Sequence, residues 1–177
     1  MSLHSKNQDI PTAVLVLADG QFFYGHGCGH IGEAVGEVCF NTAMTGYQEI
    51  LTDPSYAGQI ITFTFPHIGN VGTNDEDIET ITPSSRGAIL RMDITQPSNW
   101  RATRDLDAWL KSHNHSAITG VDTRVLTRPI RDNGAPNAVI CHKADGKFDL
   151  DALKAQATEW SGLEGLDLAK EVSCTQS

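Results

Sequence analysis

The 177-residue sequence lacks any stretch close to the ~20 consecutive apolar residues that cross a lipid bilayer. Its first residues, MSLHSKNQDI, also lack the apolar core of a secretory signal peptide. We therefore expect a cytoplasmic protein without membrane contact. Basic residues are scarce, because 13 Lys and Arg stand against 22 Asp and Glu and leave a net charge of −9. That balance argues against nucleic acid or an anionic membrane surface as a partner.

Paired cysteines are absent too. Cys28, Cys39, Cys141 and Cys174 form no C-x-x-C pair and match no zinc-binding spacing. A chain without a secretory signal is expected in a reducing compartment, so we predict free thiols, with two disulfides as the alternative. Cys39, inside VGEVCFN, is interpreted as a small buried hydrophobe.

Apolar runs rich in β-branched and aromatic residues predict strands. They cover residues 12–17, 21–25, 34–41, 59–65, 86–92, 117–121 and 138–142. The Asp19-Gly20 pair between the first two runs predicts a hairpin. Helices are predicted only in the second half of the chain. Strands followed by helices indicate an α+β class with a mixed, layered β/β/α arrangement.

Three helices have a recognisable cap and an apolar face. The first starts at Thr103 and buries Leu106, Trp109, Leu110 and His113. The second covers 123–133, with Asp122 before it and Gly134 after it. The third covers 150–160 and follows Asp149. In the second helix we expect Val125, Leu126 and Ile130 to be buried. Pro129 in its interior costs ~3 kcal/mol and predicts a kink, because Ile130 and Arg131 continue the pattern.

Three arginines, Arg124, Arg128 and Arg131, recur along the second predicted helix. Arg124 and Arg128 are four residues apart and lie on one face. They form either a solvated face or a docking surface for carboxylates on another chain, since a guanidinium group suits that role.

The segment from Phe40 to Asn74 reads FNTAMTGYQEILTDPSYAGQIITFTFPHIGNVGTN and contains no Lys or Arg. Its turn formers and hydroxyl residues predict a strand, a long ordered loop over residues 41–59, a second strand and a Gly-rich turn. Such loops commonly contact a ligand or a partner. The turn Gly69-Asn70-Val71-Gly72 lacks the lysine of a phosphate-binding loop, so a turn with positive φ is favoured over an anion cradle.

Two constellations raise the alternative of an independent activity. Asp53, Ser55 and His67 supply the residue types of a hydrolase triad, although no G-x-S-x-G motif surrounds Ser55. His113 and His115 would share a face in a strand and suit a metal, although no further ligand stands at a supporting spacing. We assign neither catalytic residues nor a metal site from these residues.

Five motifs in order resemble the N-terminal domain of the small subunit of carbamoyl-phosphate synthetase. They are VLVLADGQFFYGHG, GEVCFNTAMTGYQEILTDPSYAGQIITFTFPHIGNVGTN, DLDAWLKSHN, GVDTRVLTRPIRDNGAPNAVI and GLDLAKEVS. The resemblance implies a swivelling β/β/α domain over residues 11–160, after a disordered tail at 1–10. Residues 161–177 would then be a linker to a missing class I glutamine amidotransferase domain. That domain carries the family's Cys, His and Glu, so none of the four cysteines here would be the nucleophile.

The resemblance also implies a function. The chain would be a non-catalytic assembly domain within a heterodimeric ligase that makes carbamoyl phosphate from glutamine, bicarbonate and two ATP for arginine and pyrimidine synthesis. Its partners would be the large subunit and its own amidotransferase domain. Ser55, in LTDPSY, would contribute to the L-glutamine pocket across the domain boundary. This chain would hold no cofactor, because the large subunit uses the ATP and Mg.

Overall fold

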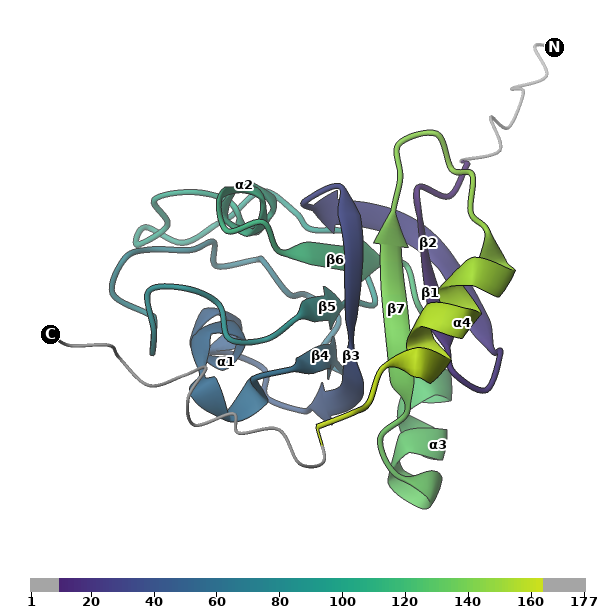
Figure 1. Cartoon of the computed structure of the whole chain (residues 1–177). Coiled ribbons are helices and arrows are strands. Elements are labelled where there is room, and N and C mark those ends of the chain that lie inside the picture. The colour runs from purple at the N-terminus through teal and green to yellow at the C-terminus, as the bar shows by residue number, and fades with distance from the viewer. Residues whose placement is uncertain (1–9, 164–177) are drawn as a thin grey trace, which may run out of the picture.

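A computed structural model describes residues 10–163 (Figure 1). The tail expected at 1–10 and the linker expected at 161–177 therefore lie almost wholly outside the described residues. Within the described part, every predicted strand is present, with shifted ends. The strands are β1 (Ala13–Leu17), β2 (Phe22–Gly29), β3 (Gly32–Asn41), β4 (Gln59–Phe63), β5 (Gly87–Ile89), β6 (Ser116–Thr119) and β7 (Asn137–His142).

The strands close into a barrel in the order β1-β2-β6-β5-β4-β3-β7. Strands β3, β4, β5 and β6 pair in parallel, and the remaining pairs are antiparallel. The predicted β1–β2 hairpin is confirmed, with Gly20 at φ +94° in its turn. The mixed class of strands and helices is also confirmed, whereas the swivelling, layered description stays a prediction. Barrel closure leaves each strand paired on both edges, which the linear pattern did not reveal.

The barrel has apolar residues on both its inner and its outer face. In β1, successive apolar side chains point alternately inward and outward. Ala13, Leu15 and Leu17 pack inside the barrel, while Val14 and Val16 point outward against α4 (Leu150–Glu159). The apolar run of β1 is continuous because a strand covered on both faces needs no polar alternation. α1 (Tyr47–Thr52) and α2 (Leu106–Ser112) cover a second outer region, in the cluster that holds Phe63 and Trp109.

The helices of the second half are close to the prediction. They are α2 (Leu106–Ser112), α3 (Thr123–Asn133) and α4, and each starts at an Asp whose carboxylate accepts a backbone N–H. Asp105 caps α2, so the predicted start at Thr103 is wrong, because the Asp105 carboxylate reaches the N–H of Ala108 at 2.7 Å. No helix within residues 10–163 is long and apolar enough to span a membrane.

Two side-chain predictions are wrong. Val125 is 54% exposed, because the buried face of α3 is set by Thr123, Leu126 and Ile130. His113 is the C-cap of α2 and only half-buried. The helix does continue beyond Pro129, as its apolar spacing predicted.

A helix also lies where only a loop was predicted. α1 (Tyr47–Thr52) follows Gly46, which adopts a left-handed conformation at φ +78°. Its buried Tyr47 and Leu51 are one turn apart and face the barrel. A helix of six residues is too short to give a clear period in sequence, so the pattern there indicates a loop.

Candidate functional site

The most distinctive local structure is the tight turn that carries Ser55. A 3₁₀ turn, Pro54–Tyr56, follows α1 directly, and the Asp53 carboxylate accepts the N–H of Ser55 at 2.8 Å. Pro54 at the first position fixes the backbone for this turn. Ser55 itself is exposed, and its hydroxyl makes no hydrogen bond with any described residue. The turn therefore exposes to solvent a hydroxyl that has no hydrogen-bond partner among the described residues.

Buried hydrogen bonds hold this turn in place. Thr52, fully buried at the end of α1, donates its hydroxyl to the Gln48 carbonyl and accepts the N–H of Glu79, both at 2.9 Å. On the other side of the turn, the Asn41 side-chain amide donates to the Tyr56 hydroxyl at 3.0 Å. Ser55 thus sits on a frame anchored to β3 and to a distant loop. Such anchoring is what a positioned binding group requires.

The last described residues pass beside the same turn. Gly58 has φ +78°, and a β-carbon placed on it would lie 2.3 Å from Leu163 Cδ2. Upstream, the Asn137 side-chain amide donates to the Trp160 carbonyl at 3.0 Å. Figure 1 shows the chain running from α4 to the end of β3. No sequence pattern indicates this proximity, because it joins residues about 100 positions apart in the chain.

The Gly-rich turn at the end of the segment is a structural turn. Gly69 and Gly72 both have positive φ, at +97° and +70°, as the turn interpretation predicted. The Gly72 carbonyl accepts the Tyr47 hydroxyl, and the Gln48 amide exchanges hydrogen bonds with the backbone of Asn74 at 2.6 and 3.0 Å. The turn thus ties α1 to the loop that follows β4.

The structure does not assemble the hydrolase triad. His67 is exposed and packs edge-on against Phe65, with 5.8 Å between the ring centroids. Within residues 10–163, no hydrogen bond joins His67 to Ser55 or to Asp53. The Asp53 carboxylate instead accepts a hydrogen bond from the backbone N–H of Ser55. Among the residues that the structure describes, Ser55 therefore has no base to activate it.

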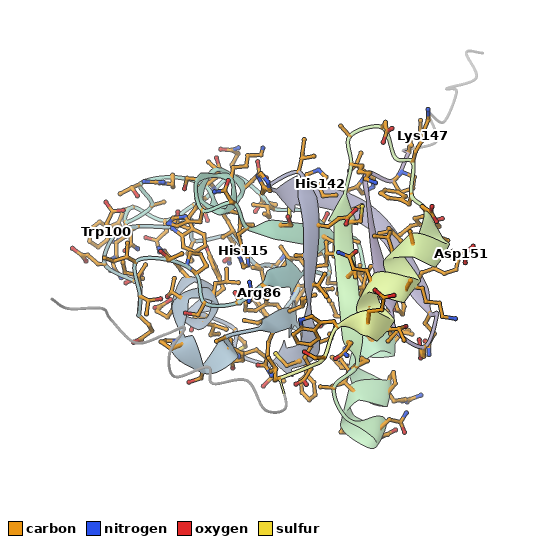
Figure 2. All side chains as sticks on the ribbon, in the orientation of Figure 1. Arg86, Trp100, His115, His142, Lys147 and Asp151 are labelled. Carbon is orange, nitrogen blue, oxygen red and sulfur yellow. The ribbon has the colours of Figure 1, made fainter. Side chains whose placement is uncertain are left out.

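The paired histidines separate rather than converge. Asn114 between them has φ +53°, which turns the chain so that His113 stacks on Trp109 while His115 enters the interior (Figure 2). Burial lowers the pKa of His115 to about 4, with a smaller contribution from the charge of His113. Within the described residues, no three His, Cys, Asp or Glu side chains are grouped to hold a metal ion.

The three described cysteines, Cys28, Cys39 and Cys141, are free thiols, as predicted. Burial raises the pKa of Cys28 and Cys39 to about 12, and that of Cys141 to about 11. A thiol is nucleophilic only as the thiolate, so these groups are unreactive near neutral pH. Cys39 is half-buried rather than fully enclosed, and Cys174 lies outside the described residues.

The three arginines of α3 are exposed and lie together. Arg124, Arg128 and Arg131 line an open depression of about 520 Å³ with Phe40 and Thr42 of the segment before α1. Thr64 and Thr127 complete its lining. The structure thus brings the arginines next to the segment that carries Ser55, which the sequence did not indicate.

Comparison with known proteins gives a consistent result. A profile of the family described as "Carbamoyl-phosphate synthase small chain, CPSase domain" matches residues 15–140. The chain is 65% identical over 170 residues to the carbamoyl phosphate synthase small chains of Bradyrhizobium diazoefficiens and Brucella anthropi. Those alignments cover 94% of this chain but only 43% and 42% of the two relatives. The chain thus spans less than half the length of these relatives.

Among solved structures, an aminopeptidase from Aneurinibacillus sp. strain AM-1 aligns with 75% of this chain and 31% of its own. Its TM-score is 0.42 at 12% identity.

Proposed function

Because the chain belongs to the family of the carbamoyl-phosphate synthase small chain, we propose that it is the part of that subunit which completes the glutamine site and docks on the large chain. It acts by supplying a rigid surface. Bond breaking takes place in the remaining part of the subunit, a class I glutamine amidotransferase domain that follows this one. The released ammonia then passes to the large chain.

The observation that supports this proposal is the free Ser55 hydroxyl on its anchored turn, beside the segment 160–163. A hydroxyl both donates and accepts, so it suits the carboxylate and ammonium groups of L-glutamine. Because Leu163 packs against Gly58, the C-terminal end of the described residues lies close to the Ser55 turn. A glutamine site shared between Ser55 and the next domain is consistent with that placement.

Exposed apolar side chains support a role within an assembly. Trp100 is 91% exposed, Ile81 is 85% exposed and Met44 is 69% exposed. Figure 2 shows Trp100 at the outer edge of the molecule, directed away from the barrel. Covering these groups with another polypeptide would remove apolar area from water. In the assembled cytoplasmic heterodimer, the large chain binds ATP and Mg and forms carbamoyl phosphate for arginine and pyrimidine synthesis.

A hybrid small chain tests the proposal. This chain replaces the matching 170 residues of the Brucella anthropi small chain, to which it is 65% identical, and the hybrid is mixed with that organism's large chain. We expect glutamine-driven carbamoyl phosphate synthesis within about 10-fold of the parent enzyme, since surface substitutions away from special features change stability little. Product formation is measured with glutamine and with ammonia as the nitrogen donor.

The 177-residue chain alone is the control, and it should release no ammonia from glutamine. A hybrid that folds but fails to bind the large chain would contradict the docking role. Glutamine hydrolysis by the lone chain, lost on His67→Ala, would instead support the independent hydrolase.

A further inference from the structure

We infer that the depression lined by Arg124, Arg128 and Arg131 binds an acidic segment of a separate protein partner, which under the proposed function is the large chain. This inference rests on the proposed function and identifies one of its contact surfaces. The occupant presents two carboxylates about 6 Å apart, the spacing of groups one helical turn from each other, next to an apolar side chain.

The charge of this surface is unbalanced. Arg131 Nε lies 3.4 Å from Asp132 Oδ1, whereas Arg124 and Arg128 form no ion pair within residues 10–163. The lining of the depression holds no acidic residue. A concentrated positive surface on a chain of net charge −9 attracts carboxylates from outside.

Helix α3 gains nothing from the charges of Arg124 and Arg128. Arg124 stands in the first turn of α3, where the positive end of the helix dipole disfavours a cation. Arg128 lies one turn later on the same face, so the two like charges repel each other. A cation at the helix N-terminus and a pair of like charges are both unfavourable. Two such features at one place are typical of a functional site, because bound carboxylates would relieve both electrostatic penalties.

The shape of the surface favours a polypeptide over a small anion. Phe40 lines one side of the depression and is 36% exposed. It is an apolar group that a free phosphate or carboxylate would not cover. Arginine beside apolar groups is a combination enriched at the centres of protein interfaces.

The surface is connected to the Ser55 turn. Phe40 precedes Asn41, and the Asn41 amide donates to the hydroxyl of Tyr56, the neighbour of Ser55. In Figure 1, α3, the end of β3 and α1 lie on the same lower side of the barrel. A partner held on α3 is therefore placed near the site at which glutamine is bound.

The test uses the hybrid small chain with Arg124→Glu and Arg128→Glu together. Its dissociation constant for the large chain should rise by about 10-fold or more, because reversing charges adds repulsion to the lost attraction. The dependence of binding on salt should weaken as well. The matched control is Lys147→Glu with Lys154→Glu, which changes the net charge equally at exposed positions on and before α4.

The variant should melt no lower than the unmodified hybrid, since acidic residues suit the start of a helix. Its glutamine hydrolysis without the large chain should be unchanged. Equal affinities for the double arginine variant and the lysine control would overturn the inference. Reduced hydrolysis with unchanged affinity would overturn it too, because the arginines would then face the rest of the small chain. An unmodified hybrid that fails to bind the large chain would refute the proposed function itself.

Discussion

Ser55→Ala in the hybrid small chain should raise the glutamine concentration for half-maximal synthesis by about 10- to 100-fold, the worth of a hydrogen bond to a charged group. Ammonia-driven synthesis should stay unchanged, because free ammonia bypasses the glutamine site. The hydroxyl has no partner within residues 10–163, so its removal leaves no buried group unsatisfied and the fold keeps its stability. Steady-state rates with each nitrogen donor give the comparison.

Two further variants separate binding from structure. Ser55→Thr keeps a hydroxyl and should restore most of the affinity for glutamine. Ser98→Ala removes another exposed hydroxyl, whose contact with the Asn70 carbonyl is 3.4 Å long, and should have no effect on either donor. An equal loss of synthesis with glutamine and with ammonia in Ser55→Ala would contradict a role in the glutamine pocket.

Acid should weaken the fold through His115. Its pKa is near 4 in the folded chain against an ordinary value of 6.5, so the folded state holds the neutral ring while the unfolded state takes up a proton first. Stability is therefore complete above pH 6.5 and falls as the pH drops toward 4. The total loss is about 3 kcal/mol at ~1.4 kcal/mol for each pKa unit. Denaturant unfolding of the 177-residue chain across this range measures it.

His115→Gln should remove this part of the pH dependence. The variant is less stable at neutral pH, but its free energy of unfolding should fall less steeply between pH 6.5 and 4 than that of the unmodified chain. Ser85, whose Oγ lies 3.4 Å from His115 Nε2, keeps its hydrogen bond to the Leu51 carbonyl, so the Ser85 hydroxyl is not left without a partner. Parallel curves for the two proteins would show that His115 is not the titrating group.

The strands were predictable because the amino-acid composition of each strand reflects which of its faces are buried. β1, for example, is apolar throughout since α4 covers one face and the barrel interior covers the other. Barrel closure was not predictable. It depends on β3 pairing with β7 and β2 pairing with β6, and pairings between residues so far apart leave no periodic signal.

In the candidate site, too, some features were predictable from the sequence and others were not. The sequence placed Ser55 in a special segment, and only the family resemblance suggested its ligand. The frame of the turn depends on contacts between distant residues, such as Asn41 with Tyr56 and Gly58 with Leu163, which no spacing rule describes. His113 and His115 would share a face only in an extended chain, and the left-handed Asn114 separates them.

The central claim is that Ser55 faces bound glutamine in the complete subunit. Its most direct test is the rate at which maleimide labels a Ser55→Cys hybrid, read by mass spectrometry of the peptide that contains residue 55. At ten times the half-saturating glutamine concentration, labelling should slow by about 10-fold, the protection expected from site occupancy. A Ser98→Cys hybrid should show no protection. Labelling of residue 55 at an unchanged rate, in a hybrid that still uses glutamine, would contradict the account.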